Sequence, residues 1–214
     1  MQAGSKQEYS AREEIAHAVT HGIGALLSVA ALVLLIVRAS STGDVWRVVS
    51  FSIFGTSMVL LYTASTLYHS FSRTDARMRL KVFDHAMIYV LIAGSYTPFL
   101  LITLRGAWGW SLFGVLWGMT LMGISFKVFF IGRFPRMSTL LYLTMGWVGV
   151  IAAKPMYEAL PGACLGWLLA GGLFYSLGTI FYTRESLKYH HAVWHLFVLA
   201  GTCCHFQSVY GYLA

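Results

Sequence analysis

Charged residues are scarce in this chain of 214 residues. Asp, Glu, Lys and Arg together make up 11% of it, whereas 57% of the residues are hydrophobic and the mean hydropathy is +0.67. Soluble domains carry about 25% charged residues, so this composition excludes an ordinary soluble protein. A transmembrane helix needs roughly 20 mostly apolar residues, and a chain of this length holds about seven such helices with short loops. No room is left for a separate soluble domain.

Cysteine is scarce as well. Cys164, Cys203 and Cys204 lie within or beside apolar runs, and two of them are adjacent. They form neither a disulfide framework nor a CxxC metal pattern, so we interpret them as small apolar fillers. The chain also lacks internal repeats and low-complexity tracts. The polar segment 1–14 is not followed by a small-residue cleavage signature, so we expect the first apolar run to be retained as a span.

Seven apolar runs bounded by charged residues, Gly or Pro predict an all-α protein, a bundle of seven transmembrane helices that forms one domain over residues 1–214. The fifth run is the weakest, because Lys154, Pro155 and Pro161 break it. Pro98 lies inside the third run, where we expect it to kink or locally open the helix. The predicted spans are 15–37, 46–68, 82–104, 107–127, 137–154, 162–182 and 189–213.

Basic residues are distributed unequally between the two ends of the predicted bundle. With the N-terminus inside, eleven of the fifteen Lys and Arg residues fall in cytoplasmic segments. Cytoplasmic loops collect such residues, so we predict a multi-pass protein of the inner (plasma) membrane with its N-terminus inside and its C-terminus outside. The net charge of +7 is then a basic rim facing anionic headgroups, and we expect no nucleic-acid partner. The eleven are Lys6, Arg12, Arg73, Arg77, Arg79, Lys81, Lys127, Arg133, Arg136, Arg184 and Lys188; the other four are Arg38, Arg47, Arg105 and Lys154.

Histidines are concentrated in one layer of the predicted bundle. Seven of the eight fall near the cytoplasmic ends of the spans, whereas His205 lies about 15 Å further along the last helix than His195. A single histidine at such a depth is readily explained by a ring that contacts lipid headgroups. Seven in one layer favour a shared site instead. The seven are His17, His21, His69, His85, His190, His191 and His195.

The spacing of several of these polar residues suits a metal site. His191 and His195 are four residues apart, so one helical face presents both imidazoles to a single ion. Ser65 and His69 share a face of the second span in the same way, and Asp84 opens the third span. Three protein ligands plus a water molecule are the usual coordination of catalytic zinc.

Four stretches carry a resemblance to a known family: "EEIAHAVTHGIG", "STLYHSF", "KVFDHAMIYVLIAGSYTPFLL" and "HAVWHLFVLAGTCCHF". In order and spacing, the chain resembles the bacterial hemolysin III family from about residue 13 to its end. That family is the prokaryotic branch of the progestin and adipoQ receptor superfamily.

The resemblance implies a fold and a set of site residues. The adiponectin receptors, a distant branch, have seven helices with the N-terminus inside and a zinc ion held near the cytoplasmic face by three histidines. Matched by motif, the zinc ligands here would be His69, His191 and His195. The acid that hydrogen-bonds the zinc-bound water would be Asp84, and the serine of the SxxxH motif would be Ser65. As catalytic residues we therefore predict Asp84 and Ser65.

The remaining histidines receive lesser roles. We expect Glu14, His17 and His21 to line the cytoplasmic mouth or to position the ligands, without direct ligation. His190 points about 100° away from His191 on a helix, so we expect it to contact headgroups. We expect His85 to support the site from outside the ligand shell, and His205 to make a hydrogen bond between helices.

Three classes of function remain open from the sequence. The first is an intramembrane zinc hydrolase that cleaves an amide or ester bond in a lipid, as proposed for receptor-type relatives and for the alkaline ceramidases grouped with them. The second is a receptor or regulator of membrane lipid state with a structural zinc, and the third is a pore. The resemblance also implies a link to membrane lipid homeostasis, with membrane lipids as partners. The last span lacks a lysine for a Schiff base, which excludes a retinal protein.

Overall fold

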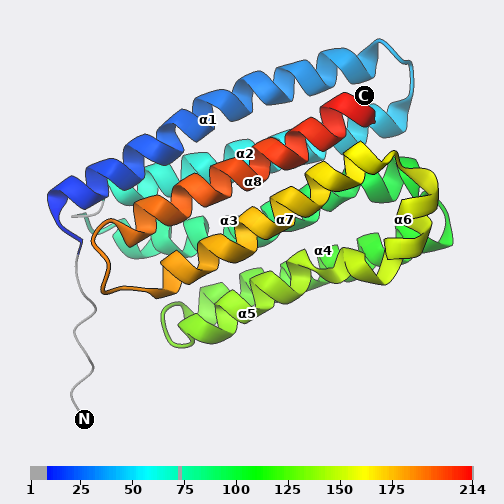
Figure 1. Cartoon of the computed structure of the whole chain (residues 1–214). Coiled ribbons are helices and arrows are strands. Elements are labelled where there is room, and N and C mark those ends of the chain that lie inside the picture. The colour runs from blue at the N-terminus through cyan, green and yellow to red at the C-terminus, as the bar shows by residue number, and fades with distance from the viewer. Residues whose placement is uncertain (1–8, 72–73, 214) are drawn as a thin grey trace.

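The computed structural model describes residues 9–71 and 74–213, and this part of the chain is almost entirely helical (Figure 1). Seven segments are long and apolar enough to cross a membrane, which confirms the predicted all-α class and number of spans. The helices are α1 (Ala11–Ser40), α2 (Val45–Ser70), α3 (Arg77–Pro98), the π-helical η1 (Phe99–Thr103), α4 (Ala107–Phe130), α5 (Pro135–Gly146), the 3-10 helix η2 (Val148–Ala152), α6 (Ala153–Ala159), α7 (Gly162–Thr183) and α8 (His190–Tyr212).

Helix α1 begins four residues earlier than the apolar run predicts, because Ser10 and Glu13 form a capping box. The Glu13 backbone N–H donates to Ser10 Oγ at 3.3 Å, and the Ser10 N–H donates to Glu13 Oε2 at 3.0 Å. Both groups would otherwise be unpaired at the helix start. Because of the earlier start, Glu13 and Glu14 lie in the first turn of α1 rather than before the helix.

Two spans are irregular, and the sequence predicts only one of the irregularities correctly. At Pro98, α3 gives way to the π-helix η1, where the Leu104 N–H reaches the Phe99 carbonyl at 2.9 Å, so the predicted local opening is present. The expected break at Lys154 and Pro155 is wrong. The fifth span is interrupted earlier, at Trp147, and α6 runs through Pro155, which lies in its first turn, where a missing N–H costs no helical hydrogen bond.

Helices α2 and α3 lie at the centre of the bundle. Within their most apolar windows, 56% and 67% of the residues are buried, compared with 22% in α1. Helix α2 packs between α1 and α3, and α8 packs against both α1 and α7 (Figure 1). The buried polar side chains of the two helices therefore face other helices; they include Ser57, Ser65 and His69 of α2 and Asp84, Ser95 and Thr97 of α3.

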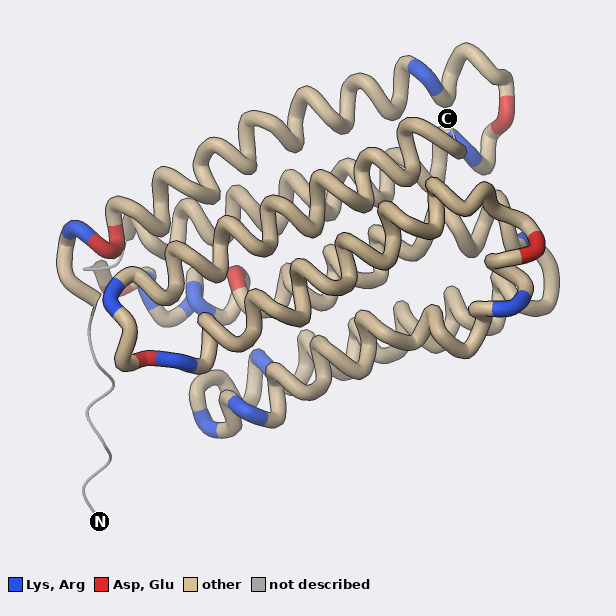
Figure 2. The backbone as a smooth tube through the Cα atoms, viewed as in Figure 1, with Lys and Arg blue, Asp and Glu red and all other residues tan. Residues whose placement is uncertain are grey.

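The two ends of the bundle differ in charge. Lys and Arg gather at the end where α1, α3, α5 and α8 begin, which we call the basic end (Figure 2). The opposite end, where α8 finishes, holds the four residues that the sequence assigns to it: Arg38 in the last turn of α1, Arg47 in the first turn of α2, Arg105 just before α4 and Lys154 in α6. Lys6 and Arg73, which were also assigned to the cytoplasm, lie outside the described residues.

This asymmetry generates a prediction about topology. Because cytoplasmic loops collect Lys and Arg, a reporter inserted within residues 71–76 should behave as cytoplasmic, and one fused after Ala214 as extracytoplasmic. Paired alkaline phosphatase and fluorescent protein fusions would measure this. A cytoplasmic fusion at Ala214 would contradict the assignment of the basic end to the cytoplasm.

A second prediction concerns the packing of α4 on α3. A Cβ atom at Gly123 would lie 2.6 Å from ring atoms of Tyr89, which is 2% exposed and cannot move aside. We expect Gly123→Ala to destabilise the protein by about 1–3 kcal/mol, measured as a lower midpoint of thermal unfolding in detergent micelles. Gly118→Ala in the same helix is the matched control, since, apart from its chain neighbours and the adjacent backbone of α4, no described atom lies within 4 Å of its Cβ position. Equal effects of the two variants would contradict the close contact.

Candidate metal centre

Three histidines converge at the basic end of the bundle. His69 comes from the last turn of α2, and His191 and His195 come from the first two turns of α8. Their ring centroids lie 4.6–5.3 Å apart, and one ligand atom from each lies within 4.8 Å of the others. All three side chains are buried. Zinc binds imidazole nitrogen at about 2.0–2.1 Å, so small rotations would bring the three nitrogens to one ion.

Two ring nitrogens of this group support a metal. His69 Nε2 and His191 Nδ1 are buried, and no group in the described part of the chain makes a hydrogen bond with either. A buried polar atom without a partner is costly, and such atoms call for an explanation. A cation would supply the missing partner of both, so the three histidines fit the zinc ion that the resemblance implies.

The opposite ring nitrogens of two of these histidines are held by other side chains or backbone. His69 Nδ1 donates to Glu14 Oε2 at 2.7 Å, and Arg77 Nη2 donates to Glu14 Oε1 at 3.1 Å. His195 Nδ1 lies 3.0 Å from Thr20 Oγ1. Histidines that ligate metals usually donate their second N–H in this way, which fixes the ring orientation. The contacts leave Nε2 as the ligating atom of His69 and His195.

Helix α1 also fixes the start of α8. Tyr189, the residue before α8, has a left-handed backbone with φ of 59°, and its N–H donates to Glu13 Oε1 at 3.2 Å. Tyr9, just before α1, covers the cluster, with ring centroids 4.7 Å from His17 and 5.5 Å from His191. Burial raises the pKa of the Tyr9 phenol, so this covering side chain is neutral.

His17 and His21 lie inside the histidine cluster rather than at its mouth. The His17 ring centroid is 4.7 Å from that of His69 and 4.9 Å from that of His191, and the His21 ring stacks on His195 at 3.5 Å. Within the described residues, the ring nitrogens of His17 and His21 have no hydrogen-bond partner. The sequence carried a signal for this, because His17 and His21 are four residues apart, like His191 and His195.

Asp84 and Ser65 contribute to the same site. Both line the cavity that His191 and His195 also line, and both are buried. Asp84 Oδ2 lies 3.3 Å from His85 Nδ1, which donates to the Lys81 carbonyl at 2.9 Å. The Ser65 hydroxyl is buried and lacks a hydrogen-bond partner among residues 9–71 and 74–213. A carboxylate and a free hydroxyl beside three imidazoles can exchange protons with a molecule in the cavity.

The other two histidines lie outside the ligand group. The expectation that His190 contacts headgroups is wrong, because it is 5% exposed and its Nδ1 donates to the Phe181 carbonyl of α7 at 3.1 Å. His205 Nε2 donates to the Leu168 carbonyl of α7 at 3.3 Å, which confirms the predicted hydrogen bond between helices.

Comparison with known proteins agrees with the resemblance seen in the motifs. The profile of a family described as "Haemolysin-III related" matches residues 9–206. The chain belongs to this family. Its similarity to named members extends over nearly the whole length of each protein.

Three relatives illustrate the range of the family. The chain is 51% identical to "Hemolysin-3 homolog" of Bacillus subtilis (strain 168) over 204 residues, which cover 95% of this chain and 96% of the relative. It is 51% identical to "Hemolysin-3" of Bacillus cereus, over 94% of this chain and 92% of the relative. It is also 27% identical to "Monocyte to macrophage differentiation factor" of Homo sapiens, over 99% of this chain and 89% of the relative.

The geometry of this haemolysin-III-related site predicts which histidine substitutions would remove a bound zinc ion and which would not. If zinc binds here, His69→Ala, His191→Ala and His195→Ala should each lose most of the zinc that survives dialysis, since each removes one of the three proposed ligands. His190→Ala and His205→Ala are the controls, because their ring nitrogens bond to helix carbonyls. Metal analysis of purified protein measures the result. An empty site in His205→Ala alone would contradict the assignment.

Proposed function

We propose that this haemolysin-III-related protein spans the bacterial inner membrane as a single seven-helix domain, with its N-terminus inside and its C-terminus outside. It binds zinc through His69, His191 and His195 and hydrolyses amide or ester bonds of membrane lipids, and it serves membrane lipid homeostasis. The observation that carries the proposal is a long, mostly apolar cavity that His191 and His195 line at one end.

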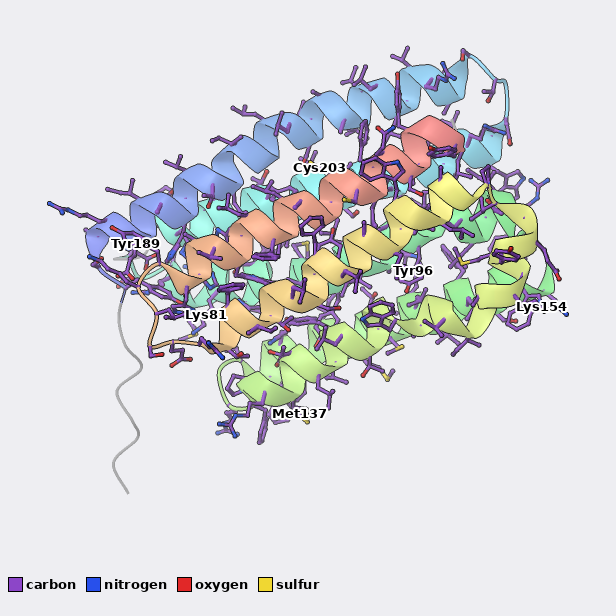
Figure 3. All side chains as sticks on the ribbon, viewed as in Figure 1. Lys81, Tyr96, Met137, Lys154, Tyr189 and Cys203 are labelled. Carbon is purple, nitrogen blue, oxygen red and sulfur yellow. The ribbon has the colours of Figure 1, made fainter. Side chains whose placement is uncertain are left out.

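The cavity has a volume of about 740 Å³ and lies among α2, α3, α5, α6, α7 and α8, and His21 of α1 also lines it. Near the basic end it is lined by Asp84, His191 and His195. Most of the remaining wall is apolar. It passes Tyr96, near the middle of the bundle, and reaches Lys154 at the end opposite Tyr189 (Figure 3). A binding site of this kind, mostly apolar with a few convergent polar groups, suits an acyl chain attached to a polar linkage.

The chemistry follows from what each group can supply. Zinc would be held by His69, His191 and His195, and it would supply a bound water with a pKa of about 7 and a positive charge that polarises a carbonyl oxygen. Asp84, which is buried and lines the cavity, accepts the proton of the attacking water and returns it to the leaving amine or alcohol. Ser65, whose hydroxyl has no partner in the described part of the chain, donates to the oxygen that becomes negative on the carbonyl.

A regulator of lipid state with a structural zinc is the second candidate function. Structural zinc sites are closed by four protein ligands, and the His17 ring centroid lies within 5.6 Å of those of all three histidines. A pore, the reading that the name of the relative "Hemolysin-3" suggests, is less favoured. Asp84 and four of the five histidines that line the cavity lie near the basic end, and most of the remaining wall is apolar, whereas a conducting pore needs polar groups along the whole membrane depth.

The test of the proposed hydrolase is Asp84→Asn. The substitution keeps the shape of the side chain and all three proposed ligands, so the protein should retain zinc while turnover falls by about 10²–10⁴-fold. The assay incubates purified protein with ceramides, other N-acyl lipids and glycerophospholipids, and it measures released fatty acid. Asp44→Asn is the matched control, because Asp44 caps α2 at the opposite end and Asn caps equally well.

Unchanged activity in Asp84→Asn would contradict the proposed role of this carboxylate. Zinc-loaded protein that releases fatty acid from none of these lipids would favour the regulator instead.

A further inference from the structure

We propose that Glu14, His17 and His69 form a second position for a divalent transition metal, next to the three-histidine site and sharing His69 with it. The ion occupies this position in transit between the basic end of the bundle and the three-histidine site. This inference goes beyond lipid hydrolysis, and it depends on the side chains of α1, which the proposed reaction does not use.

The geometry of the three groups suits one ion. Their ligand atoms lie within 4.8 Å of one another, with Glu14 Oε2 2.7 Å from His69 Nδ1 and 3.7 Å from His17 Nδ1. Ligand atoms in a tetrahedral zinc site lie about 3.4 Å apart, so small rotations would complete the coordination. Glu14 and His17 share a face of α1, because they are three residues apart. All three side chains are buried, with exposed fractions of 7%, 0% and 2%.

His17 supplies the second observation. Its side chain is fully buried, and neither of its ring nitrogens has a hydrogen-bond partner in the described residues. The 3.7 Å between its Nδ1 and Glu14 Oε2 is too long for a hydrogen bond. A buried imidazole whose two ring nitrogens both lack a hydrogen-bond partner destabilises the fold, so packing alone does not explain its position beside a buried carboxylate oxygen. A cation between the two groups would satisfy both.

The shared ligand makes the two positions alternatives. A neutral imidazole binds metal through one nitrogen and keeps a proton on the other. His69 uses Nε2 for the three-histidine site and Nδ1 for the Glu14 side, so a single ion occupies one position or the other. Arg77, which donates to Glu14 Oε1 at 3.1 Å, opposes a second positive charge there. The position is therefore weaker than the three-histidine site, as a transfer position must be.

The decisive experiment removes the three-histidine site and measures whether the protein still binds a metal ion. Zn²⁺ and Co²⁺ are titrated into the His191→Ala/His195→Ala double variant, which should bind about one ion more weakly than the natural chain. Adding His17→Ala should weaken this binding by about 10–100-fold or more, whereas adding His190→Ala should not. Adding Arg77→Gln should tighten it by about two- to fivefold, the range of a partly exposed ion pair. Binding in the double variant that is indifferent to His17→Ala would overturn the proposal.

A second measurement uses a chain in which the three-histidine site is intact and folding is not in question. His17→Asn should slow zinc uptake by about tenfold in rapid mixing, while the three-histidine site still fills with one ion at saturating zinc. Uptake at the natural rate would overturn the transfer role. Neither experiment measures lipid hydrolysis. Failure of the second metal position would therefore leave the proposed hydrolase untested, and failure of the hydrolase would leave the metal position untested.

Discussion

Two adjacent buried or half-buried carboxylates on α1 hold the basic end of this protein together. Glu14 accepts hydrogen bonds from His69 on α2 and from Arg77 at the start of α3. Glu13 accepts one from the N–H of Tyr189, which opens α8. Four helices therefore meet at one turn of α1. In an environment of low dielectric such charge-assisted bonds are strong, and each partner left alone would be costly, so the helix ends and the histidines that they carry are fixed together.

The close approach of α1, α2 and α8 positions the remaining histidine of the cluster, His21. A Cβ atom at Gly24 of α1 would lie 2.8 Å from both Tyr62 of α2 and Leu199 of α8, so only glycine lets these three helices come so close. Small residues at helix contacts are the usual device in membranes, where lipid offers no hydrophobic force to drive helices together. The contact lies one turn beyond His21, and it explains how that ring can stack directly on His195.

A chain of hydroxyl groups separates the histidine layer from the apolar remainder of the bundle. Tyr62 donates to Thr202 Oγ1 at 2.6 Å, and the Tyr175 hydroxyl lies 2.8 Å from the same atom, which ties α2, α8 and α7 together. The cavity passes Tyr175 and continues along mostly apolar side chains. The bundle thus has a polar end and an apolar interior, the same division that a membrane lipid has between its linkage and its acyl chain.

The sequence by itself determined the fold class, the seven spans and the layer in which the histidines lie. Hydropathy and helical periodicity report these features directly, because a membrane fixes the length and depth of every span. The same periodicity, together with the family resemblance, selected His69, His191 and His195 as a group and set His205 apart. It also raised the possibility that Pro98 opens its helix.

Only the tertiary structure decided what each helical face meets. Periodicity says that Glu14, His17 and His21 share a face of α1, but it does not say that this face packs on His69 and His195. It could not show that His190 turns inward to a carbonyl of α7, or that the fifth span breaks at Trp147 rather than at Lys154. These features depend on how closely helices far apart in the sequence approach one another. That approach is set by side-chain packing between helices, which the pattern along one helix does not contain.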